Sequence, residues 1–332
     1  MKQFILLIST LVFFSVTLRS AEIPKCYNEV DQVLWIVSDV ESTIANYKKL
    51  GFSQIKDLGQ VEMESEINGN KVKIRLVCAN LAGARVNWVQ PLNGKSVFQE
   101  FLRKHGDGAI SLVHRFSAGE ELKKEIGRLE DLGIHVLDDL TIRTGNGDLK
   151  FVLMDTQREG KYCLGFTYGE SGLEIHQALG AENRNDMKLS QYAFAIRDPE
   201  PVSAFWHKLG LPEFQIDQPV LGEPRYYGEV TDHELMQGWQ RHGSITYEWC
   251  IPLKPPIVYE DHIQRHGEGI HHLAFMVKDM DEVLEDYTSR GYVVSMGGTW
   301  GEKGKPGSGR YEYIDLEEAG GLTMELLWSF IE

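Results

Sequence analysis

The sequence is poor in cysteine. Only four cysteines occur in 332 residues, and no two of them form a C-x-x-C pair. So few cysteines in a chain of this size argue against a disulfide framework. Cys78 and Cys250 lie within apolar stretches, where a buried free thiol is the common state. We therefore assign no disulfide from the sequence.

Basic residues are also in the minority. The chain has 34 Lys and Arg against 49 Asp and Glu, which gives a formal net charge of −15. No stretch rich in Lys and Arg is present, and a nucleic-acid partner needs such a basic face. We expect no nucleic-acid partner and interpret the acidic excess as a contribution to solubility.

Long hydrophobic runs are absent except at the start of the sequence. Lys2 precedes an apolar run from Phe4 to Leu18, and small residues follow at Ser20 and Ala21. This layout is typical of a secretory signal peptide, here residues 1–20, with cleavage after Ser20. The run is short for a membrane span. We expect an exported protein, periplasmic or secreted, whose mature form does not enter a membrane.

The remaining chain contains a motif repeated four times. Three copies begin with an apolar run that leads to an Asp, and a Gly follows the Asp at the same distance in each copy. The pairs are Asp39 and Gly51, Asp198 and Gly210, and Asp279 and Gly291. The fourth copy is more divergent: HGDGAISLVHRF (His105–Phe116) aligns with HGEGIHHLAFMV (His266–Val277).

Each copy predicts the same order of elements. The apolar run predicts a strand, the Asp a helix N-cap and the Gly a helix C-cap. Three further strand candidates follow each helix, and polar or Pro-containing links separate the modules. The sequence therefore predicts an α+β fold built from four β-α-β-β-β modules.

Four such modules resemble the vicinal oxygen chelate superfamily, which includes glyoxalase I, bleomycin-resistance proteins and extradiol dioxygenases. The resemblance implies two tandem domains, at residues 29–181 and 186–331, each a cupped mixed sheet with helices outside. In that superfamily the cup holds a divalent metal, and its ligands come from the first and last strands of both modules. Some members complete the cup within one chain and others in a homodimer, and we leave this choice open.

Glu325 and His272 stand out before any alignment, because both lie in apolar strands. A buried carboxylate costs several kcal/mol unless it is protonated, paired or bound to a metal. The resemblance implies a metal-ligand set of Gln191, Glu248, His272 and Glu325, similar to that of the eukaryotic-type glyoxalase I. Such donors suit one divalent metal: Zn, Ni, Co, Mn or Fe. We expect His271 to point to the opposite face, since strand neighbours alternate.

The corresponding positions of the first half are Gln32, Asn87, Ser111 and Glu174. None of them is a His, and Ser and Asn are poor metal ligands. We expect this degenerate N-terminal domain to have no tight metal site.

The resemblance implies a metal-dependent lyase or isomerase of the glyoxalase type. Such an enzyme moves a proton next to a carbonyl in a small substrate with adjacent oxygens, through a metal-bound enediolate. Glu325 or Glu248, displaced from the metal, would take the carbon-bound proton. One alternative is an iron-dependent dioxygenase, although Gln191 and Glu248 depart from its usual two His and one Glu. A second alternative is a non-catalytic, ligand-sequestering protein of the bleomycin-resistance type.

Two further stretches are candidates for contact with a substrate. The Gly-rich, basic segment Trp300–Arg310 is either a lid that neutralises an anionic substrate or a solvated loop. Trp239–His242 either approaches the cup or forms a turn.

Overall fold

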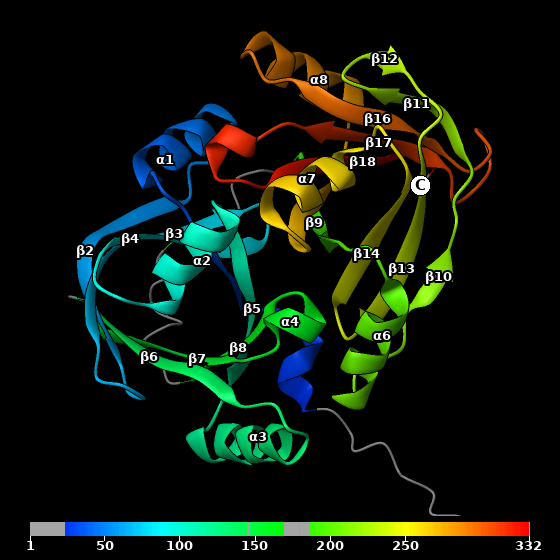
Figure 1. Cartoon of the computed structure of the whole chain (residues 1–332). Coiled ribbons are helices and arrows are strands. Elements are labelled where there is room, and N and C mark those ends of the chain that lie inside the picture. Colours follow the sequence, from blue (N-terminus) through cyan, green and yellow to red (C-terminus); the bar gives the residue numbers. More distant parts are fainter. Residues whose placement is uncertain (1–23, 145–146, 169–178, 180–185, 332) are drawn as a thin grey trace, which may run out of the picture.

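The computed structural model describes residues 24–144, 147–168, 179 and 186–331. Each half of the chain forms one curled sheet, and α1, α3, α6 and α8 lie on the outside of the two sheets (Figure 1). The predicted signal peptide and Glu174 lie outside the described residues. None of the described helices is long and apolar enough to cross a membrane.

The first half is a closed barrel of eight strands in the order β1-β4-β3-β2-β6-β7-β8-β5. A short 3-10 helix, η1 (Lys25–Asn28), precedes it. Its elements are β1 (Gln32–Ile36), α1 (Val40–Lys49), β2 (Ile55–Ser65), β3 (Lys71–Leu81), β4 (Ala84–Asn93), α2 (Val97–His105), β5 (Gly108–Phe116), α3 (Gly119–Asp131), β6 (Val136–Thr144), β7 (Gly147–Met154), α4 (Gln157–Gly160) and β8 (Cys163–Tyr168). Closure differs from the open cup that the resemblance implies.

The second half is a ten-stranded sheet in the order β10-β13-β14-β9-β15-β18-β17-β16-β11-β12. Strands β10 and β11 follow each other in sequence yet lie toward opposite edges, so residues 218–220 carry the chain from one side of the curled sheet to the other. The elements are β9 (Met187–Ala195), α6 (Pro199–Lys208), β10 (Gln215–Asp217), β11 (Leu221–Tyr226), β12 (Glu229–Val230), β13 (Glu234–His242), β14 (Ile245–Lys254), α7 (Val258–His266), β15 (Gly269–Val277), α8 (Met280–Ser289), β16 (Val294–Trp300), β17 (Gly309–Ile314), η2 (Glu317–Ala319) and β18 (Thr323–Ser329).

The repeated helices begin and end where the motif predicts. Each N-cap Asp side chain accepts a hydrogen bond from a backbone N–H of the first turn, in the pairs Asp39–Ser42, Asp198–Glu200 and Asp279–Glu282. Gly51, Gly210 and Gly291 follow the helices with φ of 93°, 102° and 87°. Glycine favours this left-handed region, which explains the fixed spacing. The α+β fold with four modules is confirmed, and the third module carries two additional strands, β11 and β12, between β10 and β13. The exact domain limits 29–181 and 186–331 remain a prediction.

Three of the described α-helices were not predicted from the sequence: the four-residue α4 and the nine-residue α2 and α7. Helices α2 and α7 join the modules within each half, where we expected only polar links. Phe98 and Phe101 of α2 pack into the apolar interior of the barrel. Val258 and Tyr259 of α7 pack in the same way against the inner face of the second sheet. Each helix therefore closes one end of its sheet.

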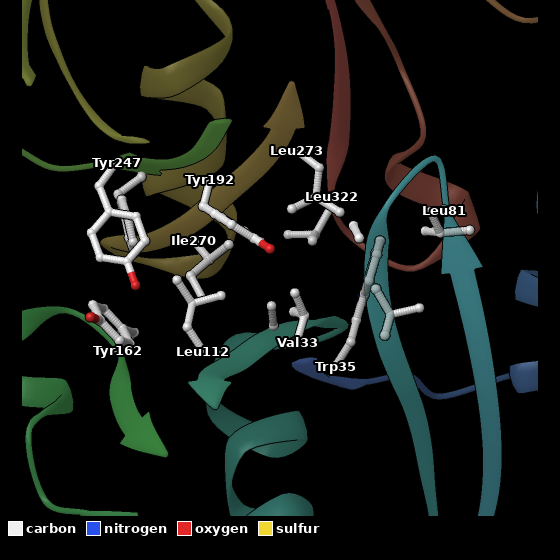
Figure 2. Packing of buried hydrophobic residues seen from close by; sticks show 14 of the residues in the cluster. Val33, Trp35, Leu81, Leu112, Tyr162, Tyr192, Tyr247, Ile270, Leu273 and Leu322 are labelled. Carbon is white, nitrogen blue, oxygen red and sulfur yellow. The ribbon is translucent and has the colours of Figure 1, made fainter. Parts of the chain in front are cut away.

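The two halves share one hydrophobic core. Figure 2 shows Val33, Trp35 and Leu112 of the first half beside Ile270 and Leu273 of the second. All four cysteines are free, and Cys78 and Cys250 are buried as expected.

Candidate metal centre

Four neighbouring strands in the middle of the second sheet bring the predicted ligands together. They lie in the order β14-β9-β15-β18, and they carry Glu248, Gln191, His272 and Glu325 respectively. Ala274 pairs with Gln191 on one side and with Glu325 on the other. Residues on paired positions share a face of the sheet. Ala193, two residues along β9 from Gln191, pairs with both Glu248 and His272. Strand register therefore sets all four side chains on one face.

The donor atoms of this group are close to one another. His272 Nε2 lies 3.2 Å from Glu325 Oε2 and 3.6 Å from Glu248 Oε2. Gln191 Nε2 donates to Glu248 Oε2 at 3.3 Å. The donor atoms of Glu248, His272 and Glu325 all lie within 4.8 Å of one another, and no member of the group is more than 6 % exposed.

The electrostatics of the group fit a divalent cation. Burial raises the pKa of Glu325, and the nearby Glu248 raises it further. Burial alone would lower the pKa of His272, but hydrogen bonds to Glu248 and Glu325 raise it to about 9. In addition, Gln191 Oε1 is buried and has no hydrogen-bond donor among the described residues. One cation would neutralise both carboxylates and satisfy this oxygen. That these residues ligate a metal remains a prediction.

Gln237 is a member of the site that the sequence did not reveal. Its Nε2 donates a hydrogen bond to Glu248 Oε1 from β13. Both oxygens of Glu248 therefore accept from an amide, one from Gln191 and one from Gln237. The β13–β14 hairpin register, in which Gln237 pairs with Cys250, was the signal needed to find it.

His271 does not point away from the site, so the expectation from strand alternation is wrong. The β9–β15 register shifts between Ile270 and His272, and this bulge leaves both histidines on the inner side. His271 Nδ1 lies 2.7 Å from His272 Nδ1. Burial, together with His262 and His272, holds the pKa of His271 well below its usual value.

Two tyrosines enclose the histidines. The Tyr259 ring stacks near His272, and the Tyr313 ring meets His272 edge-on. Their hydroxyls lie 2.7 Å apart. Tyr259 comes from the unpredicted helix α7, so no sequence pattern placed it at the site.

The first half preserves the positions but not the donors. Gln32, Asn87 and Ser111 are buried, and Asn87 Nδ2 donates to Gln32 Oε1. Glu174 lies outside the described residues, and among the described residues Gly165 takes the place of Glu325. Strand β8 pairs with β5 so that Gly165 faces Val113, just as Glu325 faces Ala274 in the second half.

A cavity of about 390 Å³ opens onto the group, and Glu248, Glu325 and Gln191 line it. Its walls include Trp239, Arg241 and Trp300; the stretch around Trp239 is therefore a strand facing the cavity and not a turn. Two hollows of about 760 and 1100 Å³ lie over the first half, and one of about 410 Å³ lies between Asn46 and residues 315–319. Within the described part of the chain, the cluster of Glu248, His272 and Glu325 is the only group of its kind.

Residues 190–309 match the family model described as "Glyoxalase/Bleomycin resistance protein/Dioxygenase superfamily". A solved variant of 4-hydroxymandelate synthase from Streptomyces coelicolor is similar at a TM-score of 0.58 and 14 % identity, over 90 % of this chain and 92 % of that one. A catechol 2,3-dioxygenase structure aligns at a TM-score of 0.44 and 12 % identity, over 91 % of this chain and 93 % of the other. No curated protein sequence matches.

Proposed function

We propose that this protein is a metal-dependent enzyme of the glyoxalase type. Its repeats, its family match and its tandem fold support its resemblance to the vicinal oxygen chelate superfamily. The enzyme would act as a lyase or isomerase that moves a proton next to a carbonyl in a small oxygenated substrate. The observation that carries this proposal is the buried group of two carboxylates, one imidazole and one amide beside a cavity. Proton transfer needs a base at the cavity, and both carboxylates reach it.

Gln191, Glu248, His272 and Glu325 would hold one divalent metal. The chemistry of these donors suits Zn, Ni, Co, Mn or Fe. When bound, the metal would supply Lewis-acid polarisation of two adjacent substrate oxygens.

The hydrogen bonds assign different tasks to the two carboxylates. Glu248 is held at both oxygens by Gln191 and Gln237, so it is fixed in position. Glu325 contacts His272 and has its pKa raised by burial. A raised pKa makes a carboxylate better suited to accept a proton. Glu325 would therefore accept the carbon-bound proton and return it to the neighbouring carbon, with Glu248 as the second candidate.

The test combines elemental analysis of the purified protein with the Glu325→Gln variant and a substrate panel. The panel contains 2-oxoaldehyde adducts, 2-hydroxy ketones and catechols. We expect about one equivalent of metal per chain, a stability that falls with chelator, and loss of turnover in Glu325→Gln. A metal-free protein whose stability ignores chelators would instead support ligand sequestration. Full activity of Glu325→Gln would exclude Glu325 as the base.

An iron-dependent dioxygenase is the second candidate. The family description includes dioxygenases, and the ligand cluster lies in the second of two tandem domains, as the resemblance to that class of enzyme implies. Oxygen uptake with Fe²⁺ and a catechol distinguishes the two reactions. Sustained uptake that depends on His272 would place the dioxygenase reading first.

We also propose that the enzyme acts outside the cytoplasm on a small molecule, without a nucleic-acid partner. The layout of residues 1–20 and the net charge of −15 support this. N-terminal sequencing of the exported protein would test cleavage after Ser20.

A further inference from the structure

Arg241 is the one basic side chain among the described residues that line the cavity. Arg241 lies on β13, opposite Thr246 of β14. Trp239, two residues earlier on the same strand, lies opposite Glu248 and so nearer the site. Because strand side chains alternate, Gln237, Trp239 and Arg241 share the face that looks into the cavity. One strand thus carries a hydrogen-bond donor to Glu248, an aromatic wall and a cation in succession.

The guanidinium of Arg241 is held by an aromatic ring and not by a carboxylate. Its central carbon lies 4.6 Å from the centre of the Trp239 ring, a cation–π arrangement that orients the guanidinium without neutralising it. Within the described part of the chain, no Asp or Glu pairs with Arg241, and its side chain is exposed at the cavity rim.

Other arginines of the second half behave differently. Arg310 binds Glu312 and Asp281, and Arg225 also binds Glu312. Arg197 pairs with Glu260. Arg241 is therefore an oriented cation whose hydrogen-bond donors remain available, beside a cavity that opens to solvent.

The basic loop suggested by the sequence does not supply this charge. Of Trp300–Arg310, only Trp300 lines the cavity among the described residues, and Lys303 lies over the Phe330 ring. The remaining walls combine apolar side chains, among them Leu221, Leu235 and Leu327, with tyrosines and the carboxylate of Asp217. The cavity thus offers chelation at its base, apolar contact at its sides and one cation at its β13 rim.

We propose that the substrate carries an anionic group, such as a carboxylate, on an apolar body, separate from its two metal-chelating oxygens, and that Arg241 binds this group. Arginine suits this role because its planar fork binds a carboxylate through two hydrogen bonds. The part of this inference that concerns the chelating oxygens of the substrate rests on the proposed function. The part that concerns its anionic group rests on Arg241 alone.

Hydroxamates provide the probe, since their two adjacent oxygens chelate divalent metals. Binding to Zn²⁺-loaded protein is measured by calorimetry for benzohydroxamate, for its 3- and 4-carboxy derivatives and for their methyl esters. The proteins are the wild type, Arg241→Gln and Arg158→Gln. The last is a matched loss of charge at an exposed position of the first half.

We expect at least one acid to bind the wild type about tenfold tighter than its ester, the size of a charge-assisted contact. Arg158→Gln should keep this preference and Arg241→Gln should lose it, while benzohydroxamate binds all three proteins equally. If benzohydroxamate binds but no acid is preferred, or if Arg241→Gln keeps the preference, the role of Arg241 is wrong and the metal centre stands. If benzohydroxamate does not bind the Zn²⁺-treated wild type, the proposed function and this inference both fail.

Discussion

His105 and His266 bind each other's main chain. His105 Nδ1 lies 2.7 Å from the carbonyl oxygen of His266, and His266 Nδ1 lies 2.6 Å from the carbonyl oxygen of His105. The two residues end helices α2 and α7, at the same position of the HGDG and HGEG motifs. Gly106 and Gly267 follow with φ of 72° and 82°, which lets each chain turn beside the other histidine. The motif therefore joins the two halves through a reciprocal contact.

The acidic residue of each motif also has matching contacts. Asp107 Oδ1 accepts from the Ser38 backbone N–H at 2.8 Å, and Glu268 Oε1 accepts from the Arg197 backbone N–H at 2.8 Å. Each carboxylate thus fixes the segment that follows the first strand of the preceding module, β1 in the first half and β9 in the second. The motif is thus structural in both halves, whereas the four candidate metal ligands lie in the second half.

The His266 contact predicts a pH-dependent part of the stability. Burial lowers the pKa of His266, but hydrogen bonds to Glu317 and to the His105 carbonyl outweigh it and raise the pKa above 6.5. A raised histidine pKa stabilises the fold fully below pH 6.5, and this stabilisation is lost as the pH rises through the folded-state pKa. Urea unfolding between pH 6 and 9 should show His266→Gln less stable by about 1–3 kcal/mol at the acid end, with the difference shrinking toward pH 9.

The comparison must be made between the two proteins at each pH. In the metal-free protein His272, with a pKa raised to about 9, titrates in the same range. Its contribution is common to wild type and variant and cancels in the difference. A difference that stays constant from pH 6 to 9 would contradict the role of the His266 charge.

Substitution of Gly165 should disturb the packing of the barrel without affecting metal binding. A Cβ at this position would collide with Ser111 Oγ and lie 2.9 Å from Val113 Cγ2. Gly165→Ala should therefore lower the free energy of unfolding by about 1–3 kcal/mol and leave the metal content unchanged. Gly127→Ala is the matched control, because nothing lies within 4 Å of a Cβ in the middle of α3; it should stabilise by up to about 1 kcal/mol. Equal effects of the two changes on chemical denaturation would show that the barrel interior tolerates a side chain at position 165.

Replacing His271 should change the metal affinity, because His271 controls which ring nitrogen of His272 carries the proton. If His272 Nε2 binds the metal, its Nδ1 carries the proton and donates to His271 Nδ1, 2.7 Å away. His271→Leu removes this acceptor and should weaken metal binding about 10–100-fold. His271→Asn places an oxygen near the same position and should retain most of the affinity. Competition with a chelating dye measures both, and equal affinities for the Leu and Asn variants would exclude this positioning role.

Substitutions at equivalent positions of the two halves should differ in their effect on metal binding. Loss of a group that only hydrogen-bonds a metal ligand weakens metal binding by up to about 100-fold. His272→Ala removes a ligand itself, so metal affinity should fall by at least this factor. Ser111→Ala changes the corresponding position of the barrel and should leave the metal content of the protein unaltered. Elemental analysis after dialysis decides the matter. A fall in metal content with Ser111→Ala would mean that the first half also contributes to metal binding.

The sequence by itself determined the modules and the four residues of the candidate centre. Asp279 and Gly291 show why: an N-cap and a left-handed C-cap depend on hydrogen bonds within a few residues, so they can be recognised locally. Gln191 and Glu248 could be found because the resemblance assigns ligands to the first and last strands of each module, and the repeats show which residues of this chain stand there.

Only the tertiary structure decided what depends on pairing between distant strands. The bulge before His272 turned His271 inward, and the β5–β8 register put Gly165 opposite Val113. A shift of one residue moves a strand's side chains to the other face, and several apolar segments fit the same place equally well. Gln237 and Tyr259 reached the site through a hairpin and a helix whose positions are set by packing and not by any local pattern.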